Sequence, residues 1–210
     1  MTSPSLLGRL TYLVGKGTVI MSTRRGDARQ RILDAAARRF YADGVAATGI
    51  DVITAEAGVA KMSLYNNFAS KSALVEAYLD ARHDEWLGLY RARAEGAKTP
   101  AERLLAVFDA YIDHADAAYE HGFRGCGLLN AAAELPRDAP GREAVRRHKE
   151  EVERILRDEL AQLVDGPSAD RTAEHFSFLL EGAMARAGLE GDARRLIGAR
   201  GIAAEMIAAL

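Results

Sequence analysis

Polar side chains suited to hydrogen bonding with nucleic acid gather in one short stretch of this chain. They are Lys61, Ser63, Tyr65, Asn66 and Asn67. Leu64 and Phe68 lie among them at the i, i+4 spacing of a single helix face, so residues 60–68 are predicted to form a helix that buries these two residues. The ammonium, hydroxyl and amide groups then remain on its other faces. Such a helix is suited to the base edges of a DNA major groove.

The residues before this stretch predict another short helix and a tight turn. Thr48 and Asp51 have the spacing of a capping box, so we expect Thr48 to cap that helix. Apolar residues then recur at helical spacing, at Ile50, Ile53 and Ala57. Gly58 favours the left-handed conformation that ends helices, and Val59 is expected to fill the corner. The pattern is that of a helix-turn-helix.

The whole segment resembles the DNA-binding domain of the tetracycline-repressor (TetR) family, over about residues 26–86. Its motif stands here, in order, as Ile32-Leu33-Asp34-Ala35-Ala36, Phe40-Tyr41-Ala42-Asp43-Gly44, Thr48, Ala57-Gly58-Val59, Leu64-Tyr65-Asn66-Asn67-Phe68 and Ser70-Lys71-Ser72-Ala73-Leu74. Two positions depart from the usual pattern. Asn67 occupies a position where His is commonest, and Ser72 replaces an acidic residue. Neither is a packing position, so the departures bear on the operator sequence and not on the fold.

The resemblance implies an all-α fold with three parts. Residues 1–25 are expected to be a disordered extension, 26–86 a three-helix DNA-binding domain, and 87–210 a helical bundle for ligand binding and dimerisation. Two copies would place their recognition helices in successive major grooves, about 34–36 Å apart. Thr48, Tyr65 and Lys71 are assigned to phosphates. The base edges are assigned to Lys61, Ser63, Asn66 and Asn67.

Composition agrees with an all-α chain of this class. The 210 residues are 49% hydrophobic, and the apolar spacing is helical throughout. The net charge is −2, but residues 21–71 hold eight Lys or Arg and five Asp or Glu, whereas residues 72–210 hold 18 and 25. An acidic body with a modestly basic end fits a DNA-binding protein. A single cysteine excludes an internal disulfide, and no uncharged apolar run reaches 18 residues, so we expect a cytoplasmic protein without a membrane span.

The first twenty residues do not read as part of the fold. The run from Leu6 to Met21 is apolar and Gly-containing, with Arg9 and Lys16 inside it, which differs from the order of charge and apolar core in a signal peptide. Met21 looks like an ordinary start. We therefore expect residues 1–20 to be dispensable.

Further helices are predicted along the rest of the chain. The first begins at Asp27, with Gln30 as its capping partner, and ends at Gly44. Thr99-Pro100-Ala101-Glu102 and Asp165-Gly166-Pro167-Ser168 are start signals. Helices are expected over about 70–93, from 100 to about 115, at 128–135, from about Val145 to Leu163, and at 169–187 and 192–210. With the helix-turn-helix this makes nine helices, the number that the resemblance implies.

Enzyme signatures are absent from the sequence. It contains no Gly-x-Ser-x-Gly, no Gly-x-x-x-x-Gly-Lys, no His-Glu-x-x-His and no Glu-x-x-His pair. Asp80 and His83 are a carboxylate–histidine pair at i, i+3, which we interpret as a solvated pair on a surface helix. The sequence therefore predicts a protein that is not an enzyme, with no metal site and no cofactor.

An effector site is predicted in the second half of the chain. Arg124-Gly125-Cys126-Gly127-Leu128-Leu129-Asn130 resembles a segment that borders the effector cavity in one branch of the family. Cys126 is either a small buried residue or a reactive thiol whose pKa Arg124 lowers. Asn130 and Glu134 are either ligand-orienting groups or the solvent face of their helix. The predicted lining is Trp86, Phe108, Tyr111, Cys126, Asn130, Glu134, His148 and Phe178.

The function predicted from these observations is a homodimeric transcription regulator that responds to a small molecule. It is expected to be a repressor, released from its operator when the effector displaces the long helix that starts at Ser70. Two alternatives belong to other classes. One is a redox-sensing repressor that uses Cys126, and the other is a helical-bundle enzyme or carrier.

Overall fold

The computed structural model describes residues 25–117 and 120–210, and every secondary-structure element within them is a helix. The helices are α1 (Arg25–Asp43), α2 (Ile50–Ala57), α3 (Lys61–Asn67), α4 (Lys71–Ala94), α5 (Pro100–Ala115), α6 (Gly127–Glu134), α7 (Pro140–Leu160), α8 (Gly166–Glu190) and α9 (Arg194–Ala208). This confirms the all-α prediction and the order of elements. The predicted extension at 1–25 lies outside the described residues, except for Arg25, with which α1 begins.

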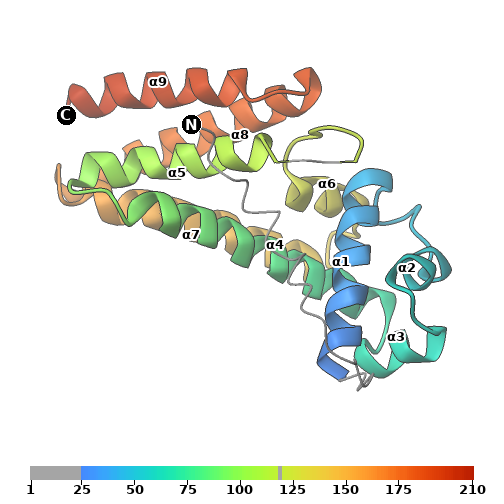
Figure 1. Ribbon diagram of the computed structural model, residues 1–210. Coiled ribbons are helices and arrows are strands. Elements are labelled where there is room, and N and C mark those ends of the chain that lie inside the picture. The colour runs from blue at the N-terminus through green and yellow to red at the C-terminus, as the bar shows by residue number, and fades with distance from the viewer. Residues whose placement is uncertain (1–24, 118–119) are drawn as a thin grey trace, which may run out of the picture.

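Two groups of helices are joined by α4 (Figure 1). α1, α2 and α3 gather at one end of the molecule, while α5, α7, α8 and α9 run side by side as an elongated bundle. α4 starts next to α3 and continues into the bundle, where it packs against α5 and α7. α6 lies between the bundle and α1.

The start of α2 differs from the sequence prediction. Its N-cap residue is Gly49, and no side chain caps it. Thr48 instead donates its hydroxyl to the carbonyl oxygens of Gly44, at 2.6 Å, and of Arg39, at 3.3 Å. The predicted Thr48–Asp51 capping box is therefore wrong. The helix begins one residue later than the capping box requires, with Gly49 as its N-cap, and the Thr48 hydroxyl binds carbonyls near the end of α1.

The start of α1 also differs from the prediction. The helix begins at Arg25, and the Gln30 side chain donates to Asp34 Oδ1 at 2.8 Å within the helix. The predicted end at Gly44 is confirmed, since this residue has a φ of 94°. Only glycine adopts that conformation without steric cost.

The structure caps α4 through Ser70, whose hydroxyl accepts the amide of Ala73 at 3.1 Å. The two start signals predicted further along the chain are both used. Thr99 and Glu102 form a full capping box at the start of α5. Asp165 accepts the amide of Ser168 at 2.9 Å, so α8 begins earlier than the predicted residue 169. These signals involve residues within three positions of one another, which explains why the sequence alone identifies them.

One continuous core runs from the small domain into the bundle. Leu64 of α3 is fully buried, and the ring of Phe40 in α1 packs edge-on against Tyr78 of α4, with centroids 5.5 Å apart. Further along, Trp86 of α4 packs on Tyr111 of α5, also at 5.5 Å. α4 therefore contributes buried residues both to the core around α1–α3 and to the core of the bundle.

Candidate DNA-binding surface and effector cavity

The α2–α3 turn places α3 on the surface of the small domain. Gly58 adopts the left-handed conformation, with φ of 62° and ψ of 41°, and the amide of Val59 donates to Thr54 O at 3.0 Å. Leu64 and Phe68 hold the inner side of α3 in the core. The outer side carries Tyr65, which is 43% exposed, together with exposed Lys61 and Asn66 and half-buried Ser63. This arrangement leaves the polar groups of α3 accessible to a DNA groove.

Lys61 is paired with a carboxylate of the preceding helix. Its Nζ lies 2.9 Å from Asp51 Oδ1, and both side chains are exposed. The hydrogen bond with Asp51 raises the pKa of Lys61, so the lysine is charged at neutral pH. An exposed pair of this kind is weak, because water and salt screen the two charges, so a DNA acceptor can replace Asp51.

Asn67 and Lys71 both contact backbone carbonyls. Asn67 donates its amide to Ser63 O at 2.7 Å, within α3. Lys71, at the start of α4, points its Nζ to Ala46 O in the α1–α2 loop at 3.5 Å. Asn67 therefore uses one donor to hold α3, whereas the long Lys71 contact is easily exchanged for a phosphate.

Two residues alter the set predicted from the sequence. Thr48, assigned to a phosphate, is only 2% exposed, because its hydroxyl binds the end of α1. Met62 of α3 is 68% exposed but is absent from the predicted set. It lies two positions before Leu64, on the opposite side of the helix, and this spacing could have identified it. Its thioether is suited to apolar contact with a thymine methyl group.

A buried cavity lies where the small domain meets the bundle. It has a volume of about 30 Å³. The residues that line it are Tyr41, Arg82, Trp86, Tyr111, His114, Cys126, Gly127, Leu128, His148 and Met184. Four of the predicted ligand residues, Trp86, Tyr111, Cys126 and His148, are thus brought together. The volume matches about one or two water molecules, so an organic ligand requires the cavity to widen.

Four predicted ligand residues lie outside the cavity, which corrects the predicted set. Phe108 packs against Phe176, with ring centroids 5.7 Å apart in the bundle core. Phe178 is 64% exposed, because it lies two positions after buried Phe176 and so faces away from the core. Asn130 donates its side-chain amide to Arg124 O at 3.0 Å. Glu134 accepts the backbone amides of Val45, at 3.1 Å, and Ala46, at 2.6 Å.

The two histidines of the cavity are neutral at physiological pH. Burial lowers the pKa of His148 to about 3, and the nearby charge of Lys149 adds to this effect. Burial likewise lowers the pKa of His114 to about 4. The Nδ1 atoms of His148 and His83 are 2.9 Å apart, so one of these rings donates to the other. Both histidines can therefore act as neutral hydrogen-bonding groups.

A half-buried ion pair borders the cavity. Lys149 Nζ lies 2.7 Å from Glu181 Oε1 and 3.7 Å from Cys126 Sγ. Burial alone would lower the pKa of Lys149, but Tyr111, Cys126 and Glu181 together outweigh it and raise the pKa above its ordinary range. Burial raises the pKa of Tyr111 to about 12. The lysine is thus a fixed positive charge beside a neutral phenol.

Two nitrogen donors of the cavity residues have no hydrogen-bond acceptor. They are Trp86 Nε1 and Arg82 Nε, both fully buried. A buried donor without a partner is destabilising, and both of these groups can only donate. The cavity therefore favours a ligand that carries an acceptor oxygen or nitrogen.

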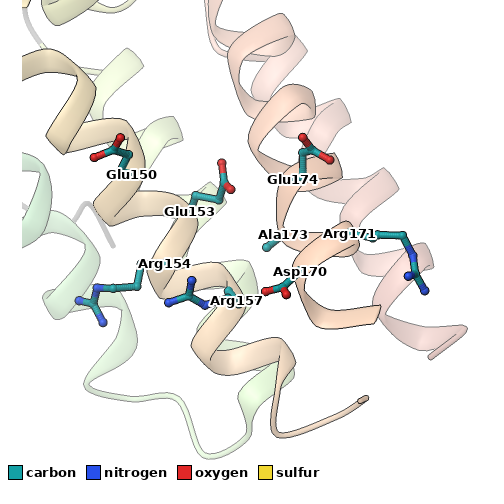
Figure 2. Close-up of a pocket in the computed structure, with 8 residues that line it drawn as sticks. All are labelled: Glu150, Glu153, Arg154, Arg157, Asp170, Arg171, Ala173 and Glu174. Carbon is teal, nitrogen blue, oxygen red and sulfur yellow. The ribbon is translucent and has the colours of Figure 1, made fainter. Parts of the chain in front are cut away.

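A second hollow, of about 430 Å³, lies between α7 and α8. Apart from Ala173, its lining is charged: Glu150, Glu153, Arg154, Arg157, Asp170, Arg171 and Glu174. Figure 2 shows Arg154 and Arg171 extending away from the space between the helices, with Arg157 and Asp170 nearer to it. A lining of this kind differs from the largely apolar walls of typical ligand sites, so the first cavity is the better effector site.

Among the residues that the structure describes, no group of three His, Cys, Asp or Glu side chains is arranged to hold a metal ion. No described helix is long and apolar enough to cross a membrane.

Two family models match the chain. One, described as bacterial regulatory proteins of the tetR family, matches residues 32–78. The other, described as a tetracyclin repressor-like C-terminal domain, matches residues 100–202. The first match falls on α1 to α4 and the second on α5 to α9.

Curated relatives match over shorter segments. The HTH-type transcriptional repressor KstR2 of Mycobacterium tuberculosis is 34% identical over 101 residues, which are 48% of this chain and 46% of that protein. The HTH-type transcriptional regulator TtgR of Pseudomonas putida is 41% identical over 41% of this chain and 43% of that protein. The chain thus spans less than half the length of these relatives.

Solved structures match over most of the chain. A TetR-family transcriptional regulator from Streptomyces coelicolor is 34% identical, with a TM-score of 0.77 over 87% of this chain and 94% of that chain. A TetR transcriptional regulator from Chloroflexus aurantiacus is 27% identical, with a TM-score of 0.75 over 88% and 96%. The chain therefore belongs to the TetR family of DNA-binding transcriptional regulators.

Proposed function

We propose that this regulator is a homodimeric repressor that a small molecule releases from its operator. The observation that carries the proposal is the cavity at the junction of the two domains, because its wall includes both bundle residues and Tyr41 of the DNA-binding domain. A ligand there would favour one relative position of the domains over another. Differential affinity of this kind is what an effector needs to shift DNA binding. The relative KstR2 is described as a repressor, which supports the same direction of control.

DNA contact is proposed for the outer side of α3 and the start of α4. Tyr65 and Lys71 are assigned to phosphates, and Lys61, Ser63 and Asn66 to base edges. Asn67 stays in the base-contact set through its remaining hydrogen-bonding capacity. Thr48 takes a positioning role, because its hydroxyl ties the α2 start to the end of α1.

The dimer is proposed to form through α8 and α9. Their outer side exposes large apolar side chains: Phe178, Leu189, Ile197 and Ile202. Glycines 182, 198 and 201 lie on the same helices, and a Cβ built on each would meet no atom within 4 Å. An exposed apolar surface between small residues allows close approach of a second helix pair. Two such pairs would complete a four-helix bundle around a twofold axis.

The effector is proposed to be a small, partly aromatic molecule with at least one acceptor atom. Several aromatic side chains line the cavity, and Trp86 Nε1 and Arg82 Nε have no hydrogen-bond acceptor. The ammonium of Lys149 stands close to the cavity through its contact with Cys126. A carbonyl, phenolate or carboxylate oxygen would satisfy these donors.

The alternatives have less support. Cys126 is the single cysteine of the chain, so no intramolecular disulfide is available to it, and its sulfur is buried beside Lys149. A redox-sensing role is therefore not favoured. An enzyme or carrier is disfavoured by membership of a regulator family. A cytoplasmic location follows from the proposed action on bacterial DNA.

Selection of bound duplexes from fragmented genomic DNA tests the proposal. We expect a pseudo-palindromic site that binds with a steep salt dependence and one protein dimer per duplex. Ser63→Ala is expected to change the base preference at one position, and Ser177→Ala on α8 serves as the matched control. Failure to enrich any sequence, or binding that salt does not weaken, would overturn the proposal.

A further inference from the structure

Tyr41 belongs to α1 of the DNA-binding domain, yet it lines the cavity. Its hydroxyl accepts the backbone amide of Arg124 at 2.7 Å and donates to Gly125 O at 3.1 Å. The ring therefore stands between the cavity and the loop that leads into α6. A ligand in the cavity would touch a residue of the DNA-binding domain without an intermediate helix.

The opposite side of this loop cannot move away to make room. A Cβ built on Gly188 of α8 would lie 2.6 Å from both Cα and N of Gly125. The loop backbone thus packs directly on the backbone of α8. Since backbone atoms in contact leave no space, the cavity cannot widen by retreat of the loop toward α8.

The aromatic wall of the bundle is also fixed. The rings of Tyr111 and His148 each lie 5.5 Å from the ring of Trp86, and all three side chains are buried. Moving any of them would open the hydrophobic core. Tyr41 is only half-buried and is held by hydrogen bonds to the loop. Of these cavity side chains, Tyr41 is therefore the one that a ligand can displace most easily.

Further contacts tie the end of α1 to the α6 region near Tyr41. The guanidinium of Arg124 donates to the carbonyls of Tyr41, at 3.3 Å, and Ala42. The carboxylate of Glu134 accepts the amides of Val45 and Ala46. We call these contacts of Arg124, Gly125 and Glu134 the α1 clamp. They occupy backbone groups at the helix end that have no partner inside the helix.

We propose that the effector acts on the DNA-binding domain directly through Tyr41. A ligand that fills the cavity displaces the Tyr41 ring, breaks its hydrogen bonds to the loop, and loosens the α1 clamp. α2 and α3 then lose their fixed orientation relative to the bundle, because both pack on α1. This inference rests on the proposed effector site, and it adds a route from cavity to DNA that does not depend on movement of α4.

Gly127→Ala tests this route without knowledge of the effector. A Cβ at Gly127 would lie 3.0 Å from Tyr41 Cδ2 and 3.0 Å from the Tyr78 hydroxyl. Gly127 and Tyr41 both line the cavity, so the added methyl group presses on the Tyr41 ring from a neighbouring cavity residue. Gly88→Ala in α4 is the matched control, since a Cβ there meets no atom within 4 Å. Helix propensity favours alanine at both positions.

Operator affinity is measured on the duplex obtained by genomic selection. We expect Gly127→Ala to weaken binding by about fivefold or more, within the usual range of allosteric coupling, and Gly88→Ala to leave it unchanged. Circular dichroism and thermal melting establish that both variants are folded.

A double-mutant cycle distinguishes an effect on operator affinity that passes through Tyr41 from one that passes through α4. In a Tyr41→Ala background the methyl group at position 127 has no ring to press on in α1. We therefore expect Gly127→Ala to cause no further loss of affinity there. The same loss in both backgrounds would mean that the methyl acts through Tyr78 and α4, and this would overturn the proposal.

Hydrogen exchange of the Val45 and Ala46 amides provides a readout that needs no DNA. Gly127→Ala is expected to speed exchange at both amides, as Glu134→Gln does by weakening the clamp directly. A wild-type protein that selects no duplex would refute the proposed function, while the exchange data would still test the clamp. If Gly127→Ala exchanges these amides at the wild-type rate, the inference fails even where the operator is bound.

Discussion

The α2–α3 turn is made by residues that follow one another in the chain, whereas the cavity wall is drawn from six helices and a loop. Gly58 and Val59 form the turn through hydrogen bonds that span at most five positions. The cavity brings Tyr41 beside Cys126, across 85 positions. The helix-turn-helix is therefore specified by residues close together in the sequence, whereas the proposed effector cavity depends on long-range packing.

Leu64→Ala is expected to have the largest effect, and it tests whether the helix-turn-helix region unfolds independently of the bundle. Removing this fully buried side chain is expected to destabilise the small domain by about 2–5 kcal/mol. Fluorescence of Trp86, the only tryptophan, reports on the bundle, and its melting transition is expected to remain. Leu163→Ala, at an exposed position, is the control and should change stability by less than about 0.5 kcal/mol. Simultaneous loss of both regions would show that they fold as a single unit.

Phe178→Arg tests whether the DNA surface needs a second copy. A charge at this exposed position of α8 is expected to yield folded monomers in sedimentation and to weaken operator binding by about thirtyfold or more, since one copy reads only one half-site. Leu163→Arg places the same charge outside α8 and α9 and should leave the protein dimeric. A Phe178→Arg protein that remains dimeric at micromolar concentration would place the interface elsewhere.

Between pH 7 and pH 5, acid is expected to act on the cavity more than on the helix-turn-helix, because residues 25–70 contain no histidine. The pKa of His148 is lowered to about 3 in the folded protein, below the ordinary value near 6.5. The unfolded chain therefore binds the proton more tightly, and stability is lost as pH falls from 6.5 toward 3. For His148 alone, the free energy of unfolding is expected to fall by about 2 kcal/mol between pH 7 and pH 5.

Thermal melting across this range checks the pH prediction. His148→Gln is expected to flatten the dependence, whereas His175→Gln, at an exposed position of α8, is expected to retain it. Equal slopes for wild type and His148→Gln would mean that this histidine is not responsible.

Lys71→Ala is expected to have the smallest effect. Loss of one phosphate contact should weaken binding to all sequences and reduce the salt-dependence slope by about 0.9. Lys61→Ala should instead relax the preference at one operator position, by about 1 kcal/mol. Lys98→Ala, in the α4–α5 loop, is the matched control. A sequence-specific loss for Lys71→Ala would exchange the roles of the two lysines.

The residues of the DNA-binding surface could be predicted from the sequence more fully than those of the cavity. The sequence places Lys61, Ser63 and Asn66 on the outer side of α3, because helical spacing from Leu64 and Phe68 fixes that side. For the cavity it identifies Trp86, Tyr111, Cys126 and His148 but not Tyr41. Periodicity tells which side of a helix is buried, but it does not tell which other helix lies against it.

The all-α class, the element order and the family could be predicted from the sequence alone, because glycine turns, caps and apolar spacing act over a few residues. The capping of α5 and α8 could be predicted for the same reason. Only the tertiary structure decided that Thr48 binds the end of α1, that Phe178 faces solvent, and that Glu134 holds the amides of Val45 and Ala46. Each of these outcomes depends on which groups the folded chain brings together, such as the Thr48 hydroxyl and the carbonyls near the end of α1.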